Sequence, residues 1–221
     1  PALGVGGVCL ALGLALGLGV TAALNSPTPP GAAPTPLASA PAPPEAETLL
    51  TRALSLARAK DPAALDAYRA AAKAGSLAAL EWLAERAPQG ERGAWRLRAA
   101  EAGSGPAACS LGTSFLDTDP SSARSWLRRA ARTGHTRAMV LLSRSLRDSR
   151  GGPADVKLAE EWFERALAAE EPLALLERGE LEFASGRLQV GAELVRRAAD
   201  ARLGAACLRY GRWLARGWPN K

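Results

Sequence analysis

The sequence predicts an all-α protein: a stacked solenoid of about five helical hairpins, preceded by a transmembrane helix. Residues 45–221 are rich in Ala, Leu and Arg and poor in Val, Ile and Thr, which favours helices over strands. One sequence unit recurs five times in this region, which is typical of a repeat architecture. An uncharged apolar stretch precedes it at residues 2–24.

The distribution of charge divides the chain into three parts. Residues 1–44 contain no Asp, Glu, Lys, Arg or His, so the whole formal charge of +6 belongs to residues 45–221. We therefore expect a transmembrane helix or signal segment at 1–24, a Pro-rich linker at 25–44 and a repeat domain at 45–221.

Residues 2–24 have the length of a membrane-spanning helix. Their 23 residues would extend about 34 Å as a helix, and a bilayer core is roughly 30 Å thick. A cleaved signal peptide is the alternative, although its apolar region is usually only about 7–15 residues. We expect an uncleaved anchor in the inner (cell) membrane, with the repeats outside the cytoplasm. Gly13 and Gly17 form a GxxxG spacing that favours close packing with another membrane helix.

The linker at 25–44 contains eight prolines and predicts an extended, semi-rigid spacer. At about 3.1 Å per residue it would reach roughly 60 Å. Its neutral Pro/Ala/Thr composition is typical of tethers that lead from an inner-membrane anchor into a bacterial periplasm. The periplasmic location is a hypothesis from composition.

The repeated unit has a large residue at its start, a pair of small residues, a glycine eight positions on and an alanine at twelve. Copies begin at residues 67, 95, 126, 162 and 194. The glycines at 75, 103 and 134 lie where a helix must end in the left-handed conformation. Glu170 and Arg202 replace the glycine in the last two copies, and we expect those two turns to differ in geometry.

The repeats divide residues 45–221 into eleven helices, paired antiparallel, with no β-sheet. Ser76 and Ser104 follow their glycines and are expected to cap the next helix. The expected helices cover 46–59, 62–74, 76–87, 91–102, 105–116, 120–133, 135–148, 155–169, 171–185, 188–201 and 203–216.

This pattern resembles the Sel-1-like repeat family, AxxWYxxAAxxGxxxAxxxLGxxY. The best copy matches it at Ala123, Trp126, Leu127, Ala130, Ala131, Gly134, Ala138, Leu142 and Leu146, and the LG step recurs as Leu111-Gly112. The resemblance covers roughly residues 60–217. It implies a right-handed α/α superhelix related to tetratricopeptide repeats. It also implies an adaptor or scaffold for multi-protein complexes, in some members within bacterial envelopes.

Residues able to do chemistry are few. His135 is the only histidine, lies in the cap position after Gly134, and is expected to be structural. Cys109 and Cys207 occupy small apolar positions and are expected to be buried free thiols. The sequence contains no GxxxxGK[ST], GxGxxG, HExxH or CxxC motif. We therefore predict no enzyme activity, no cofactor and no metal site.

The helices after the glycine turns carry arginines off the Ala/Leu stripe, and guanidinium groups favour carboxylates. We predict that they bind an acidic segment of a partner protein, the alternative being an ordinary solvated face. Nucleic acid is not expected, because acids alternate with the bases and no aromatic stripe accompanies them. The predicted protein-binding residues are Arg137, Arg144, Arg147, Arg178, Arg209, Arg212 and Arg216.

Two functions remain open at this point. The first is a membrane-anchored adaptor for protein–protein interaction in a bacterial envelope complex. The second is a permanent accessory subunit of a larger membrane complex, which would use transmembrane helices as partners too.

Overall fold

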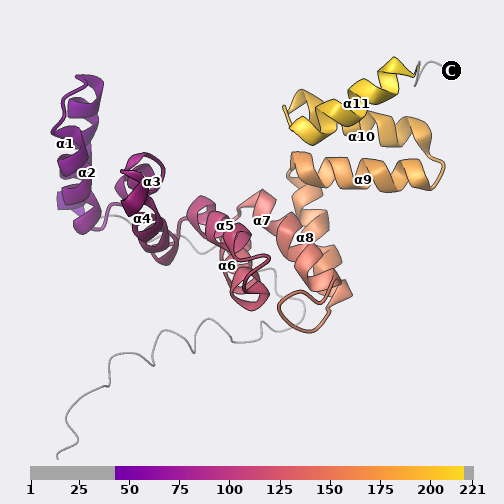
Figure 1. Cartoon of the computed structure of the whole chain (residues 1–221), viewed down its shortest axis with the longest axis horizontal. Coiled ribbons are helices and arrows are strands. Elements are labelled where there is room, and N and C mark those ends of the chain that lie inside the picture. Colours follow the sequence, from indigo (N-terminus) through magenta and orange to yellow (C-terminus); the bar gives the residue numbers. More distant parts are fainter. Residues whose placement is uncertain (1–42, 217–221) are drawn as a thin grey trace, which may run out of the picture. The chain divides into compact units, whose positions relative to one another are not determined.

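The computed structural model describes residues 43–216, which belong to one compact unit, Pro36–Lys221. This described part contains eleven α-helices and no β-strand (Figure 1). The helices are α1 (Pro44–Arg58), α2 (Ala64–Lys73), α3 (Leu77–Arg86), α4 (Gln89–Glu101), α5 (Gly105–Ser114), α6 (Pro120–Arg132), α7 (Thr136–Arg147), α8 (Val156–Ala168), α9 (Pro172–Ala184), α10 (Leu188–Asp200) and α11 (Gly204–Ala215). The predicted all-α class and all eleven helices are confirmed.

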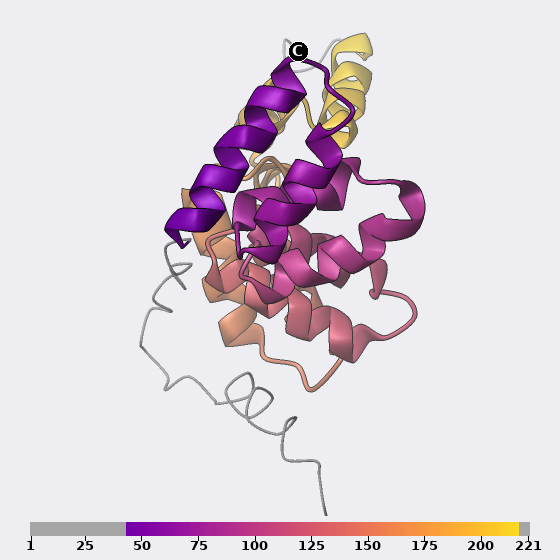
Figure 2. The same cartoon turned by 90° about the vertical axis from the view of Figure 1, so that its left-hand side faces the viewer.

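The helices pack in an order that the repeated sequence unit does not reveal. The most extensive contacts join α1 to α2, α3 to α4, α5 to α6, α7 to α8 and α9 to α10. The pair α1–α2, in indigo, runs side by side in both views (Figures 1 and 2). Helices joined by the glycine turns, such as α6 and α7, contact each other less. The packing unit is therefore the hairpin that each of these five pairs forms, and α11 is left without a following partner among the described helices.

All five turns between these units have one geometry. At Gly134 the backbone is left-handed with φ 88°, its N–H donates to Ala131 O (3.1 Å), and the N–H of His135 donates to Ala130 O (3.1 Å). This is the Schellman arrangement that ends a helix. Glu170 and Arg202 adopt φ 55° and 62° and the same two hydrogen bonds form around them. The expectation that these two turns differ is therefore wrong.

In α3, α5 and α7 the side chain of the residue after the turn caps the next helix. The Ser76 hydroxyl accepts the N–H of Ala79 at 3.3 Å, and the Ser104 hydroxyl accepts that of Ala107 at 3.2 Å. In α7 the cap is His135, whose Nδ1 accepts the N–H of Ala138 at 3.3 Å. Its predicted structural role is confirmed.

The core is continuous over α1–α8 and changes at the next helix. One cluster of buried residues extends from Ala53 in α1 to Trp162 in α8. A second cluster joins α9, α10 and α11 around Val195. A small cluster that includes Val140 and Phe163 links the two, while α8 and α9 themselves contact little. The stack therefore has a weak junction between α8 and α9.

The membrane segment and most of the linker lie outside the described residues. This holds for 1–24, for 25–42 and for the predicted packing residues Gly13 and Gly17. Within 43–216, no helix has the length and apolar character needed to cross a bilayer.

Candidate interaction surfaces

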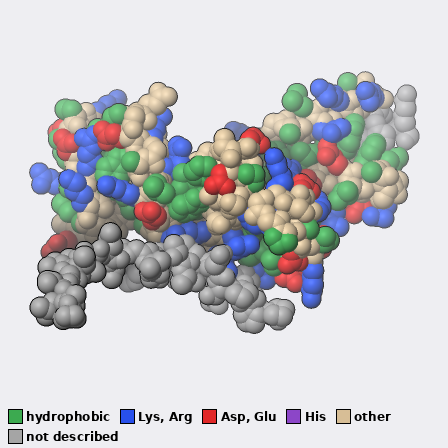
Figure 3. Space-filling model, turned by 60° about the horizontal axis from the view of Figure 1, so that its bottom comes forward, with side chains coloured by type: hydrophobic (Ala, Val, Ile, Leu, Met, Phe, Trp, Pro, Cys, Tyr) green, Lys and Arg blue, Asp and Glu red, His purple; other side chains and the backbone are tan. Residues whose placement is uncertain are grey.

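The predicted binding arginines lie on three alternate helices. Arg137, Arg144 and Arg147 are on α7, Arg178 is on α9, and Arg209, Arg212 and Arg216 belong to α11 and its C-cap. Acidic side chains of this chain surround several of them. Figure 3 shows basic, acidic and apolar side chains interspersed over one face of the molecule.

Three of these arginines form ion pairs between helices. Arg144 donates from Nε (2.7 Å) and Nη2 (2.5 Å) to Oε1 of Glu177 in α9. Arg209 lies 2.5 Å from Glu180, also in α9. Arg178 of α9 pairs with Glu160 and Glu164 of α8. The charges of these three guanidinium groups are therefore balanced within the chain, across the weak junction and the α9–α11 contact.

Arg147 lies against an aromatic ring instead. Its guanidinium carbon is 5.9 Å from the ring centre of Phe163, and that of Arg178 is 5.6 Å away. The two charges lie within the distance at which cations are attracted to a ring. Arg147 also donates to the Ser143 hydroxyl at 3.3 Å.

The other three arginines are exposed. The side chains of Arg212 and Arg216 form no hydrogen bond or ion pair with any residue in the range 43–216. They are the arginines of α11 whose charge is free to meet an acidic ligand.

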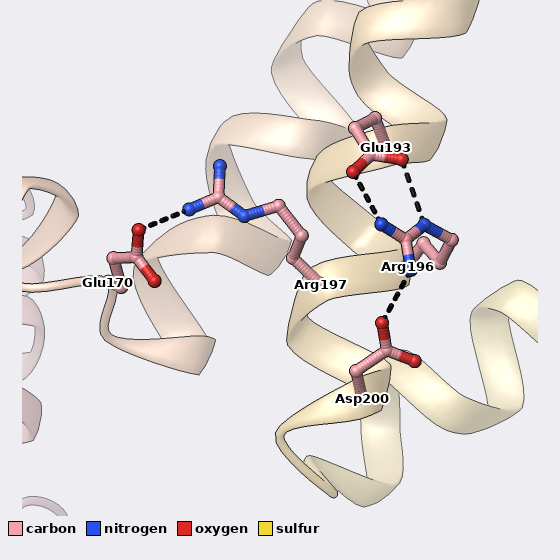
Figure 4. A network of polar contacts seen from close by, with 5 residues as sticks. All are labelled: Glu170, Glu193, Arg196, Arg197 and Asp200. Atoms are coloured by element: carbon pink, nitrogen blue, oxygen red, sulfur yellow. Dashed lines mark hydrogen bonds and ion pairs between the residues drawn. The ribbon is translucent and has the colours of Figure 1, made fainter.

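A further ion network lies on α10 (Figure 4). Arg196 bonds both carboxylate oxygens of Glu193 (2.6 and 2.8 Å) and contacts Asp200 at 2.7 Å. The hydrogen bonds to Arg196 lower the pKa of Glu193. Arg197 pairs with Glu170 at 2.7 Å. Exposed pairs of this kind contribute little to stability because water screens both charges, so the network marks a solvated face.

Arg124 of α6 is a buried charge that the sequence pattern did not reveal. Only 5% of it is exposed. Its guanidinium donates to the backbone carbonyls of Ser145 (2.5 Å), Arg150 (2.9 Å), Gly152 (3.2 Å) and Pro153 (2.8 Å), and to the Ser145 hydroxyl. These acceptors end α7 and form the loop to α8, so Arg124 holds that loop. The run Gly151-Gly152-Pro153 signals an unusual loop but not its partner.

The two described cysteines differ. Cys109 is buried, and that burial raises the pKa of its thiol. Cys207 is exposed, so the expectation that it is buried is wrong. The equivalent residues Leu80, Ala108 and Leu175 are buried and Met139 is half-buried, whereas no described helix covers this position of α11. Residues 43–216 contain no cluster of His, Cys, Asp and Glu side chains that could hold a metal ion.

Comparison with known proteins identifies the architecture. No family model matches the chain, and no curated protein matches it either. Among solved structures, a Sel1 repeat protein from Oxalobacter formigenes matches with a TM-score of 0.52 and 23% identity, over 62% of this chain and 64% of that one. The chain has the Sel1-like repeat fold.

A second structure shows the same Sel1-like fold. It is a protective antigen of uropathogenic Escherichia coli strains, described as displaying an SLR fold. The TM-score is 0.58 and the identity 18%, over 79% of this chain and 42% of the antigen. The chain thus spans less than two thirds of the length of either protein.

Proposed function

We propose that this protein is a non-catalytic adaptor that binds other proteins through its Sel1-like repeats. The observation that carries the proposal is the fold itself. Each hairpin packs only on its neighbours, so stacking generates long surfaces from equivalent positions of successive helices. Helices α7, α9 and α11 carry arginines outside their core stripes, and the side chains of Arg212 and Arg216 have no acidic partner within the described chain.

The proposed adaptor is anchored in the inner membrane of a bacterial envelope with its repeats in the periplasm. The uncharged stretch 2–24 and the proline-rich spacer 25–44 support this location. Cell fractionation of the whole chain is expected to place it in the membrane, with its repeats accessible to protease added to the periplasm. If the chain were recovered in the soluble fraction with an intact mass showing that it begins near Leu24, that result would contradict the anchor.

The second candidate is a permanent accessory subunit of a membrane complex. Gly13 and Gly17 favour it, because small residues four apart suit packing between membrane helices. Mild detergent extraction followed by native purification separates the two functions. An adaptor is expected to emerge largely alone and to recover partners only after crosslinking. A subunit would emerge with stoichiometric partners.

The acidic-partner hypothesis is tested with Arg212→Glu and Arg216→Glu together. Their side chains are exposed, so the fold should be unaffected while crosslinked partner recovery falls and loses its salt dependence. The matched control is the exchange Arg144→Glu with Glu177→Arg, which reverses two charges but retains their ion pair. Unchanged recovery with the α11 variant would reject these arginines as the binding residues.

A further inference from the structure

The helices that follow the five turns share a small-residue site. The residue eight positions after the N-cap is small and buried in each of the first four such helices, where it is Ala84, Gly112, Ser143 or Gly179. Its equivalent in α11 is Gly211, which is exposed. Five positions after the cap, Cys109 of α5, Val140 of α7 and Leu176 of α9 are buried, whereas Leu208 of α11 is 66% exposed.

The next helix covers this site by close approach. A Cβ added to Gly112 would lie 2.7 Å from Cγ of Leu127 and 3.2 Å from the carbonyl oxygen of Ala123, both in α6. A Cβ added to Gly179 would lie 2.7 Å from Val195 and 2.9 Å from the carbonyl oxygen of Gly191, both in α10. In each case the covering helix brings a small residue and, four positions later, a large apolar one.

Helix α11 has the same stripe without a cover. We define the α11 stripe as Gly204, Cys207, Leu208, Gly211 and Leu214, which follow the helical spacing of one face. A Cβ added to Gly204 or Gly211 would meet no atom within 4 Å, and Leu214 is 50% exposed. Among the described helices, α11 therefore presents an apolar stripe that no other helix covers.

The charges beside the α11 stripe indicate which kind of helix would bind there. No acidic residue occurs in α11, Arg209 is paired with Glu180, and Arg212 and Arg216 lie free beside the stripe. A second copy docked with α11 against α11 would bring two more arginines and no acidic residue of α11 to the interface, so the positive charge would stay unbalanced. A helix with acidic residues on that flank would neutralise them.

We infer that the α11 stripe is a docking site for an amphipathic, acidic helix of a partner protein. That helix supplies a small residue followed four positions later by Leu, Val or Phe, as the chain's own covering helices do. The inference rests on the proposed adaptor function and adds the kind of partner segment that would bind, an acidic amphipathic helix.

The probe is a fluorescein-labelled synthetic peptide of residues 155–169. It is the chain's own acidic covering helix, with Ala159 and Phe163 at the required spacing and Glu160, Glu161 and Glu164 beside them. Fluorescence anisotropy with the full chain is expected to show saturable binding. A peptide with the three glutamates changed to Gln should bind about fivefold more weakly, because each exposed ion pair contributes modestly. The basic covering helix, residues 119–133, should bind more weakly as well.

The decisive variant is Gly211→Leu. Its new side chain enters open space in the free chain, so folding is retained, but it fills the site and should weaken peptide binding on the order of tenfold. Gly93→Leu in α4 is the matched control, because Gly93 is also exposed, helical and without a neighbour within 4 Å. Cys207 reports coverage directly: the peptide should slow its alkylation, measured by mass spectrometry, with buried Cys109 as the unreactive reference.

Four results would overturn the inference. One is absence of peptide binding with Cys207 equally reactive throughout. Another is dimerisation of the chain alone that Gly211→Leu abolishes, which would make a second copy the occupant. The third is protection of Cys207 in the monomeric chain alone, which would show that the chain covers its own stripe. The fourth is recovery of the same crosslinked partners, in equal amounts, by wild type and by Gly211→Leu. That result would agree with the adaptor function but reject this site.

Discussion

Arg124 links the end of α7 to the loop that follows it through a set of neutral acceptors. Replacement by Lys keeps the charge but cannot reach all of the carbonyls, because an ammonium group lacks the planar fork of donors. Arg124→Lys is expected to lower the free energy of unfolding by about 2 kcal/mol, measured by urea denaturation. Arg132→Lys, half-exposed on the same helix, is the control and should change stability by less than about 0.5 kcal/mol. Equal effects of the two would contradict the role of Arg124.

His135 makes stability depend on pH. Burial lowers its pKa below the ordinary value of 6.5, partly opposed by Glu171. The folded state therefore favours the neutral ring, whose Nδ1 accepts the Ala138 N–H. Stability from this group is fully present above about pH 6.5 and is lost as the pH falls through the lowered pKa. We expect the free energy of unfolding to decrease between pH 7 and pH 5.

The control for this prediction is His135→Ser, which copies the caps at Ser76 and Ser104 and does not titrate. It should remove most of the decrease between pH 7 and pH 5. A variant that retains the full decrease would assign the effect to other groups.

The turn between α10 and α11 tests the cost of a side chain in the left-handed conformation. Arg202 has φ 62°, and its neighbour Ala201 has φ −74°. Arg202→Gly should stabilise the protein by roughly 0.5–1 kcal/mol, because left-handed backbone costs an L-residue about that or more. Ala201→Gly, one residue away in right-handed backbone, should destabilise it by a similar amount. Thermal melts of both variants distinguish the effects, and a shift of the same sign in both would contradict this account.

Sequence patterns predicted these elements well for a physical reason. Each helix end depends on a local set of hydrogen bonds, so glycine and serine mark it within a few residues. Glu170 and Arg202 show where such reasoning fails. The pattern treats a missing glycine as a different turn, whereas packing on both sides imposes the same geometry on whatever residue is present.

At the scale of the whole molecule, the junction between α8 and α9 divides the core. Contacts there are few, and ion pairs such as Arg144–Glu177 bridge to the next repeat. We expect α9–α11 to open before α5–α8, because stability in a solenoid depends on neighbouring interfaces. Hydrogen exchange with mass spectrometry should show lower protection at residues 172–215 than at 120–168. Uniform protection would show that the core is cooperative across the junction.

Long-range pairing accounts for most of what the sequence did not reveal. The seven arginines were recognisable from their spacing, but the carboxylates facing Arg144, Arg178 and Arg209 come from other helices. Cys207 is exposed because no described helix covers it, and the local sequence pattern does not show whether a covering helix is present.

The shared geometry of the turns also bears on how such a chain lengthens over evolution. Because the four hairpins from α3 to α10 each begin and end in an equivalent turn, duplication of a segment from one turn to the next adds a complete hairpin whose ends already fit. Such a duplication changes the length of the stack and leaves α11 unchanged. The number of repeats and the character of the α11 surface can therefore diverge independently among descendants of one ancestral chain.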